Sequence, residues 1–203
     1  MSRMAIIDFE TTGISPSQGD RATEVAIVLT ENGRTVDRFQ SLMNAGVSIA
    51  PFITQLTGIT NAMVRAAPPA HRVMTEAARF VGDTPLVAHN ASFDRRYWVA
   101  ELALAGMPAP QPFACTVLLS RRLYPEAPSH KLGALAEYFQ LTRTGRAHRA
   151  LADAETTVAL LQRIQHDLRT RYGVATPDHR FLCALQACTS KAVPNWLARA
   201  AAG

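Results

Sequence analysis

A hairpin signal near the start of the chain constrains its fold more than any other feature. The dipeptide Asn32-Gly33 lies between two runs rich in β-branched residues, Thr23–Leu29 and Thr35–Met43. Asn-Gly favours the positive φ angles of a two-residue turn between antiparallel strands. A shorter apolar run, Met4–Phe9, precedes them and predicts a buried strand. We therefore expect three strands that begin a sheet with antiparallel character.

The following part of the chain alternates strand-like runs with helical ones. Short apolar runs predict two further strands, at Pro85–His89 and Phe113–Cys115. Apolar residues at helical spacing predict four main helices, at His71–Val81, Ser92–Ala105, Lys131–Phe139 and Arg149–Arg171. Antiparallel strands followed by an alternation of strands and helices predict an α/β fold built on one mixed sheet.

The C-terminal end differs from the rest of the chain. Pro177 and Pro194 flank a short apolar stretch, Phe181–Ala187. We therefore expect a single folded domain at residues 1–173 and a C-terminal tail at residues 174–203 with a short helix. We expect this tail to pack back on the domain, with docking on a partner as the alternative.

Composition places the chain away from membranes. No apolar run reaches the roughly 18 residues that a membrane-spanning helix needs. The first apolar run stops at Asp8, too early for the core of a signal peptide. The 3 cysteines lack zinc-ligand spacing and are typical of free thiols in a reducing compartment. We therefore expect a cytoplasmic protein without membrane association.

The basic residues favour a polyanionic partner. The net charge is +5, and Lys131 and Lys191 are the only lysines among 21 basic residues. The guanidinium fork of arginine suits phosphate groups, and a basic protein attracts nucleic acid. Arginine-rich usage also follows from codon bias, so composition alone leaves nucleic-acid binding undecided.

Two acids, Asp8 and Glu10, end the first predicted strand. Side chains two residues apart in a strand point to the same face, so we expect these carboxylates side by side, with Phe9 buried on the other face. Two like charges this close repel each other unless a cation lies between them. Carboxylate oxygens are ligands that suit Mg²⁺ or Mn²⁺. Taken alone, the pair fits a solvated strand end equally well.

Two further acids begin predicted helices. Asp94 lies in the first turn of the helix that Ser92 is expected to cap, where an acid is often only a partner of the helix dipole. Asp153 follows His148 by five residues, which a helix turns through about 500°, so the two share no helix face. We therefore expect His148 on the loop before the helix, leaning over a site into which Asp153 points. Strand ends and helix starts are where the active-site groups of open α/β sheets gather.

Together, the pattern DxE…HNxxFD…HxxxxD resembles the DEDDh 3′–5′ exonuclease family, which includes the proofreading ε-like subunits of bacterial DNA polymerase III. The resemblance spans roughly Met4 to Leu168 and includes the segments Leu56–Thr60 and Met63–Pro68. It implies a ribonuclease H-like fold, a mixed five-stranded sheet flanked by helices. A sister subclass has tyrosine where this chain has Arg149, so the histidine subclass fits better.

The resemblance also implies roles for the acids and the histidine. The four metal-site acids of the family match Asp8, Glu10, Asp94 and Asp153, and its general base matches His148. We expect two Mg²⁺ or Mn²⁺ ions, about 3.5–4 Å apart. In this interpretation, Asp8 bridges both ions, Glu10 and Asp153 complete one, and Asp94 holds the other. An imidazole titrates near neutral pH and can take a proton from water, with His89 the next candidate for this role.

Expectations about the substrate follow from the same resemblance. Candidates to contact the terminal nucleotide are Thr11, Gly58, Ile59 and Phe93, whose apolar members favour an unpaired end. For Ile59 and Phe93, simple core packing is the alternative. Many ε subunits have His-Gly-Ile where this chain has Thr57-Gly58-Ile59, which leaves nucleotide preference open. We expect single-stranded or frayed DNA 3′ ends as substrate and nucleoside 5′-monophosphates as product, in proofreading or repair. An RNA-trimming enzyme of the oligoribonuclease or tRNA-end type, a non-catalytic polymerase-associated module and a DNA polymerase subunit as partner stay open.

Overall fold

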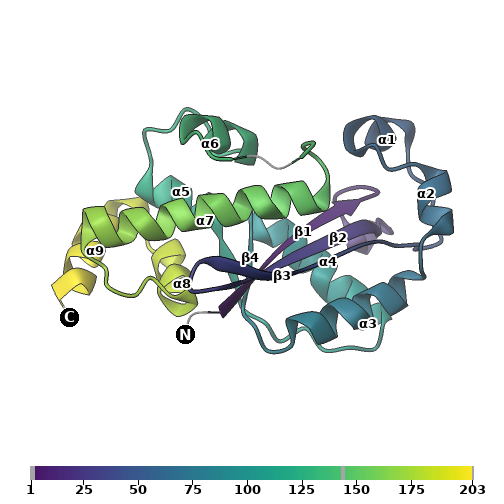
Figure 1. Ribbon diagram of the computed structural model, residues 1–203, viewed down its shortest axis with the longest axis horizontal. Coiled ribbons are helices and arrows are strands. Elements are labelled where there is room, and N and C mark those ends of the chain that lie inside the picture. Colours follow the sequence, from purple (N-terminus) through teal and green to yellow (C-terminus); the bar gives the residue numbers. More distant parts are fainter. Residues whose placement is uncertain (1–2, 143–144, 203) are drawn as a thin grey trace.

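A mixed five-stranded sheet forms the centre of the protein, in the order β3-β2-β1-β4-β5 (Figure 1). The computed structural model describes residues 3–142 and 145–202. Antiparallel pairing joins β3 to β2 and β2 to β1, while β1, β4 and β5 run parallel. The strands are β1 (Arg3–Thr11), β2 (Ala22–Glu31), β3 (Arg34–Leu42), β4 (Leu86–Ala88) and β5 (Phe113–Cys115). All five predicted strands are present, so the predicted fold class is confirmed.

The hairpin between β2 and β3 has the predicted turn. Asn32 and Gly33 have φ angles of 50° and 79°, the positive values that this connection requires. Glycine adopts such an angle without strain, and asparagine tolerates it better than most residues. The turn and a register shift between Leu29 and Thr30 bring Glu24 of β2 opposite Leu42 of β3. On its other side, Glu24 pairs with Glu10 of β1.

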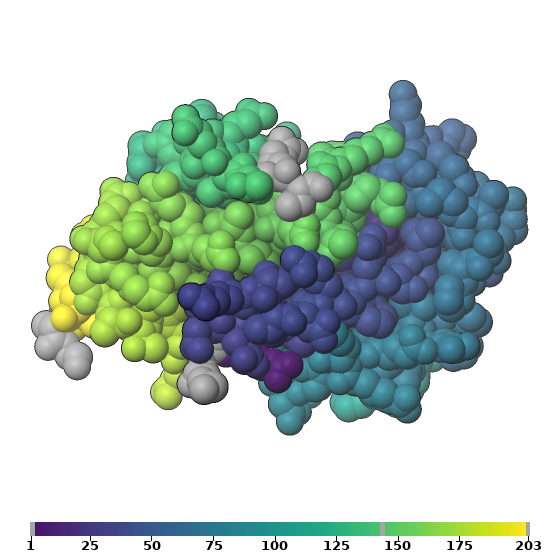
Figure 2. All heavy atoms as spheres, viewed as in Figure 1, coloured from purple at the N-terminus to yellow at the C-terminus, as the bar shows by residue number. Residues whose placement is uncertain are grey.

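Helices cover both faces of the sheet. The long helix α7 crosses one face of β1 and β2, whereas α3 and α4 lie on the opposite face (Figure 1). In the space-filling view, the green α7 lies directly against the dark blue hairpin (Figure 2). The helices are α1 (Pro51–Thr57), α2 (Asn61–Ala66), α3 (Ala70–Val81), α4 (Ala91–Leu104), α5 (Thr116–Leu123), α6 (Leu132–Tyr138), α7 (Ala150–Tyr172), α8 (His179–Ala187) and α9 (Val193–Ala202), with 3₁₀ segments at Pro16–Gln18 and Ser190–Ala192.

Alternation along β1 sorts its side chains between the two helical layers. Met4 and Ile6 are buried in the core beneath α7, whereas Ile7 and Phe9 are buried in the core beneath α3 and α4. Burying a side chain of this size contributes about 1.5–3 kcal/mol, which fixes the register of the strand. The acids of the DxE pair continue the series of Ile6, so both point to the α7 side.

The start of α4 differs from the predicted cap. Asn90, with a left-handed φ of 68°, is the N-cap, and Ser92 lies inside the first turn. Ser92 as the cap was wrong, because the left-handed turn at Asn90 ends β4 abruptly and starts the helix at Ala91. Asp94 still lies in the first turn, as predicted. Ser129 also precedes α6 without capping it, since the N-cap of that helix is Lys131.

The C-terminal region contains two helices, α8 and α9, where the sequence predicted one. Leu182, Leu185 and Leu197 are buried in the same core as α7. Gln186 accepts a hydrogen bond from the Cys115 amide at 2.6 Å and donates one to the Phe113 carbonyl at 3.1 Å. α8 therefore covers the edge of β5, where exposed backbone groups would invite another strand. A domain boundary at residue 173 stays a prediction.

The length and polarity of the helices bear on membrane association. Within residues 3–142 and 145–202, no helix combines the length and the apolar character needed to cross a membrane. α7 is the longest at 23 residues, but its sequence carries charged side chains along the exposed face.

Candidate active site

Three elements bring the predicted acids to one edge of the sheet. Asp8 and Glu10 lie near the C-terminal end of β1, while Asp94 and Asp153 lie in the first turns of α4 and α7. Because β1 and β4 are parallel, their carboxyl ends meet at the same edge. Asp94 is tied to β1 directly, since its Oδ1 accepts a hydrogen bond from the Phe9 amide at 3.2 Å.

A cleft with a volume of about 640 Å³ lies over this edge. Its walls are the end of β1 with the turn that follows, the helix α1, and the loop leading into α7. Figure 2 shows the green start of α7 next to the blue segment that contains α1 and α2. Of the predicted site residues, the cleft is lined by Asp8, Glu10, Thr11, Phe93, His148 and Asp153.

Burial and mutual repulsion change the acidity of these carboxyl groups. Burial raises the pKa of Asp8 well above its ordinary value, and the charges of Asp94 and Glu10 raise it further. Burial, followed by the charges of Asp153 and Glu24, raises the pKa of Glu10 to about 8. Burial likewise raises the pKa of Asp94 to about 8.

Salt-bridge partners for Asp8, Glu10 and Asp94 are missing among the residues that the structure describes. Burial, Asp153 and Glu24 raise the pKa of Glu10 and outweigh the charge of Arg149, which lowers it. No arginine or lysine in those ranges forms a salt bridge with Asp8, Glu10 or Asp94. Native proteins pair buried charges with an opposite charge or with a metal ion. The set therefore has the donor atoms and the excess negative charge of a divalent-cation site.

His148 lies on the loop before α7, as its spacing from Asp153 predicted. Its φ of 60° is left-handed, and its amide donates a hydrogen bond to Asp153 Oδ2 at 3.0 Å. One ligand atom from each of Glu10, His148 and Asp153 lies within 4.8 Å of the others. The exposed imidazole is thus held beside the acids by its own backbone. This spacing fits a base next to a bound ion, and it also fits a ligand of that ion.

His89 is a poor alternative base. Its Nε2 lies 3.0 Å from the His130 carbonyl, and its Nδ1 lies 2.9 Å from the Thr116 hydroxyl. Because a carbonyl oxygen only accepts, Nε2 carries the hydrogen and Nδ1 accepts from Thr116. Burial lowers the pKa of His89 to about 4, so the ring stays neutral with both nitrogens engaged. The expectation that His89 could replace His148 is therefore corrected.

Gly58 and Ile59, two of the residues predicted to contact the terminal nucleotide, do not line the cleft. Ile59 is fully buried and packs with Ile49, Ile53 and Val64, which favours core packing of its side chain over contact with a nucleotide. Gly58, at φ 75°, forms the turn after α1, and a Cβ there would lie 2.8 Å from Arg146 Nη1. α1 and α2 thus build a small core of their own, and the assignment of Gly58 and Ile59 to the nucleotide site stays a prediction.

Other apolar side chains, missed by the sequence reasoning, line the cleft. Ile14, Phe52 and Leu56 are 75%, 67% and 47% exposed, and all three face the cleft. Phe52 and Leu56 are four residues apart on α1, so they share one face of that helix. The available signal was the apolar pair Phe52 and Leu56 on a helix of only 7 residues, which is too short to bury both of its faces.

A second groove, of about 980 Å³, meets this cleft at His148 and Asp153. The exposed side chains of Arg121 and Lys131 contribute to its lining, together with His130. The two hollows therefore differ in part of their lining: the cleft beside α1 adds exposed apolar side chains to the acids, whereas the groove adds the basic side chains of Arg121 and Lys131.

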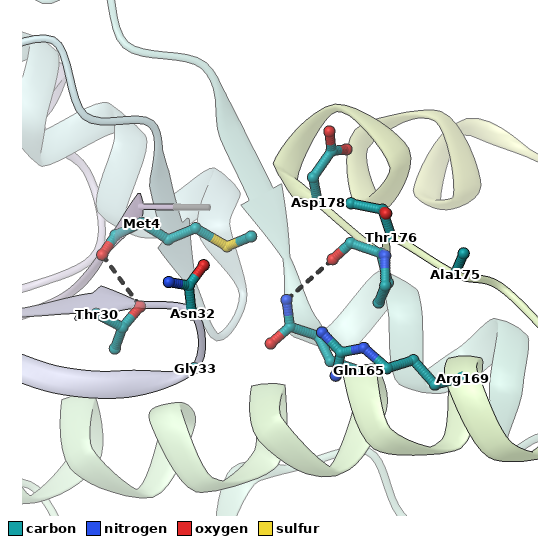
Figure 3. A pocket seen from close by; sticks show the side chains of 10 residues that line it. Met4, Thr30, Asn32, Gly33, Gln165, Arg169, Ala175, Thr176 and Asp178 are labelled. Atoms are coloured by element: carbon teal, nitrogen blue, oxygen red, sulfur yellow. Dashed lines mark hydrogen bonds between the residues drawn. The ribbon is translucent and has the colours of Figure 1, made fainter. Parts of the chain in front are cut away.

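A third and smaller cavity lies at the opposite end of β1 (Figure 3). It has a volume of about 220 Å³ and lies between the β2–β3 hairpin, the C-terminal half of α7 and the segment before α8. Gln165 donates a hydrogen bond to the Pro177 carbonyl at 2.9 Å, and Thr30 donates one to the Met4 carbonyl at 3.3 Å. These polar groups hold the surrounding elements together, and the predicted site residues lie elsewhere.

The fold and the convergent acids define a ribonuclease H-like nuclease. The family model named RNase_T, described as an exonuclease, matches residues 5–161. The chain belongs to this exonuclease family, which confirms the predicted family.

Curated relatives give the same result. The chain is 40% identical over 171 residues to the 3′–5′ exonuclease DinG of Bacillus subtilis, a match that covers 82% of this chain and 18% of that protein. It is 36% identical over 171 residues to a PolC-type DNA polymerase III of Halalkalibacterium halodurans, covering 84% of this chain and 12% of that protein. The chain thus spans less than a fifth of the length of these two relatives.

Solved structures extend the comparison. Exonuclease X in complex with 5′ overhanging duplex DNA is 32% identical, with a TM-score of 0.67, over 80% of this chain and 91% of that one. The nuclease domain of 3′hExo, a DEDDh family member bound to rAMP, has a TM-score of 0.70 at 21% identity, over 82% of this chain and 92% of that one. The second likeness shows the fold alone.

Proposed function

We propose that this chain is a metal-dependent 3′–5′ exonuclease that releases nucleoside 5′-monophosphates from DNA ends. One observation carries the proposal: Asp8, Glu10, Asp153 and His148 line a single open cleft, and Asp94 accepts a hydrogen bond from the Phe9 amide beside it. Asp8, Glu10 and Asp94 form no salt bridge within the described residues. Membership of the exonuclease family supports the same reaction.

The donor set fits divalent cations of the Mg²⁺ or Mn²⁺ type. Four carboxylates supply hard oxygen ligands, and those of Asp8, Glu10 and Asp94 lack a salt bridge within the described residues. We assign Asp8, Glu10, Asp94 and Asp153 as the residues that hold two ions. When bound, such ions neutralise the phosphate and activate a water molecule.

His148 is the proposed general base. Its amide bond to Asp153 holds the imidazole at the rim of the cleft, where it can accept the proton of the attacking water. The imidazole is exposed, so the accepted proton can pass on to solvent. Because His148 and Asp153 border both hollows, a phosphodiester bond cut there would separate a nucleotide in the cleft from a strand in the groove.

The two hollows suggest how the substrate lies. Phe93 and Phe52 line the cleft and are proposed to stack a terminal base, and Thr11 lines the same cleft. Stacking of this kind needs an unpaired base, so we propose a single-stranded or frayed 3′ end as substrate. Arg121 and Lys131 are placed to contact the phosphates of the retained strand.

DNA is the proposed polymer, and a DNA polymerase subunit is a proposed partner. Exonuclease X, the neighbour at 32% identity, is described in complex with duplex DNA, and another relative is a DNA polymerase. These comparisons favour a role in proofreading or repair over RNA trimming. The exposed apolar side chains beside the cleft carry no base-specific donors or acceptors, so we propose little preference among bases.

A direct assay tests the proposal. The purified chain is incubated with matched DNA and RNA oligomers carrying a 5′ label, with Mg²⁺, Mn²⁺ or Zn²⁺ after treatment with EDTA. We expect a ladder shortening by single nucleotides from the 3′ end of DNA, with Mg²⁺ or Mn²⁺ and without activity in EDTA. Faster cleavage of RNA would replace the proposed substrate, and internal cleavage or a strict zinc requirement would contradict the mechanism.

A further inference from the structure

A fifth buried acid, Glu24, lies next to the metal-site acids without belonging to them. Its side chain is 1% exposed, and its Cα pairs with that of Glu10 across β1 and β2. Because directly opposed residues point to the same face, Glu24 also faces the start of α7. Its charge reaches the site, since it contributes to the raised pKa of Glu10 after burial and Asp153.

Glu24 holds Arg149, the residue between His148 and the first turn of α7. Arg149 donates two hydrogen bonds to this carboxylate, from Nη2 at 2.8 Å and from Nε at 3.1 Å. The Ala150 amide, at the first turn of α7, donates a third at 3.2 Å. Gln40 of β3 donates a fourth at 2.8 Å. Such a two-pronged arginine–carboxylate pair fixes orientation as well as distance.

Arg149 lies between the two groups whose placement matters most. Arg149 follows His148 directly and is the N-cap of α7, and α7 carries Asp153 in its first turn. Fixing the guanidinium and the Ala150 amide therefore fixes the loop of the histidine and the start of the helix together. The side chain of Arg149 is 33% exposed, so it could change its conformation if Glu24 did not hold it. The charge of Glu10 already contributes to the raised pKa of Arg149.

We propose that Glu24 is a positioning residue that holds Arg149 away from the metal-site acids and thereby keeps their negative charge available for a divalent cation. The inference rests on the proposed metal-dependent function. Without Glu24, attraction between opposite charges would draw the guanidinium toward Glu10, where it would compete with the ion. Residues that orient metal ligands without touching the metal typically change metal affinity by about 10–100-fold.

The chain contains a matched control on the opposite face of the sheet, in α4. Glu101 of α4 is 2% exposed and accepts two hydrogen bonds from Arg21, both at 2.9 Å, and one from the Ala22 amide at 3.0 Å. Like the first clamp, it joins a buried glutamate to an arginine fork and a backbone amide. It anchors the start of β2, and the charges that shift the pKa values of Asp8, Glu10 and Asp94 do not include that of Arg21.

The test measures Mn²⁺ affinity by calorimetry, without nucleic acid, in the parent and in variants that keep side-chain size. Glu24→Gln should weaken Mn²⁺ binding by about 10-fold, the lower end of the expected range. Both Glu24→Gln and Glu101→Gln lose one arginine–glutamate pair, so they should lower the melting temperature by similar amounts. Only Glu24→Gln should weaken Mn²⁺ binding, and Glu101→Gln should leave it unchanged. Arg149→Gln, combined with Glu24→Gln, should restore the affinity, because the competing cation is then gone.

The outcomes separate the inference from the function that it rests on. Equal Mn²⁺ affinity in the parent and Glu24→Gln would overturn the inference while leaving the exonuclease intact. A loss of affinity that Arg149→Gln does not restore would mean that Glu24 acts through the fold alone. A parent that neither binds Mn²⁺ nor cuts DNA would instead overturn the proposed function. If Glu24→Gln fails to fold, Arg149→Gln alone still tests the idea, since it should bind Mn²⁺ at least as tightly as the parent yet turn over more slowly.

Discussion

Two sets of buried acids at the same end of the sheet differ in their partners: the acids of one set are paired with arginine, and those of the other form no salt bridge in the part of the chain that the structure describes. Glu24 and Glu101 each receive the fork of an arginine, at distances between 2.8 and 3.1 Å. Glu10 and Asp94 have no such partner within the described ranges. Burial opposes ionisation of Glu24, but hydrogen bonds from Arg149 and Gln40 outweigh it and lower the pKa. Burial raises the pKa of Glu10 and of Asp94 to about 8.

The difference teaches which acids the chain satisfies by itself and which it leaves for a ligand. A clamped glutamate is complete once the protein has folded, and it serves the geometry of a loop. An acid held close to other acids is costly until a cation arrives, because burial and repulsion both oppose its charge. Such unsatisfied charge is the mark of a functional site.

Removing an acid of the second set has the largest expected effect. Asp8→Ala should reduce hydrolysis to background, because Asp8 lies among the other three acids and would hold the ions together with them. The same change removes repulsion, so the metal-free melting temperature should rise by about 2–4 °C for each kcal/mol gained. Nuclease assays and thermal unfolding in EDTA check both parts. Substantial Mg²⁺-dependent activity in this variant would contradict the two-metal assignment.

Removing the histidine should cost less than removing the acid. His148→Ala should slow single-turnover hydrolysis by roughly 10²–10⁴-fold, the usual contribution of a positioned base. The parent rate should rise with pH through one inflection, which the variant should lose. Its Mn²⁺ affinity should change little, and a large decrease would instead make His148 a ligand. A variant with the parent rate and the same inflection would remove His148 from the mechanism.

The pH dependence of stability should separate the two sets of acids. An acid with a raised folded-state pKa holds its proton more tightly in the folded state, so stability falls as pH rises. For Glu10 and Asp94, the fall should lie between about 4, the unfolded value, and about 8. Each retained proton changes the free energy of unfolding by up to about 1.4 kcal/mol per pH unit.

Denaturant unfolding in EDTA at several pH values measures this slope. The Asp8→Ala variant is the control and should show a shallower decrease, because one source of repulsion is gone. Saturating Mn²⁺ should abolish the decrease in the parent. A metal-free stability that stays constant between pH 5 and pH 8 would mean that these acids are less perturbed than their burial indicates.

Much of the fold and the acid set could be predicted because the signals are local. The Asn32-Gly33 turn and the alternation of Met4, Ile6 and Asp8 depend on neighbours in the chain and on strand geometry alone. The loop position of His148 follows from helix periodicity. These features need no knowledge of what packs against them.

The features that the sequence did not predict depend on contacts between segments far apart in the chain. Ile59 is buried because α1 and α2 form their own small core, which no local pattern distinguishes from a nucleotide contact. The Glu24–Arg149 clamp joins residues 125 apart in the chain. From the sequence, Arg149 is recognised as the residue in place of a tyrosine. Its hydrogen bonds to Glu24 of β2 are not predictable from the sequence.

The smallest expected effect concerns the basic groove. Arg121→Ala and Lys131→Ala should each raise KM for a DNA oligomer several-fold and lower the salt dependence of binding by about one charge. Hydrolysis of a p-nitrophenyl ester of thymidine 5′-monophosphate should be unchanged, because it has no retained strand. Lys191→Ala, outside the groove, is the matched control. Equal effects on both substrates would place the retained strand elsewhere.

The protons released on metal binding test the central claim most directly. Calorimetric titration of the metal-free chain with Mn²⁺ at pH 7, in two buffers of different ionisation enthalpy, counts these protons. Ordinary carboxylates are already ionised at this pH and would release none. Because burial raises the pKa of Glu10 and Asp94 to about 8, the account predicts Mn²⁺ binding with a net release of protons. Absence of binding, or binding without proton release, would contradict it.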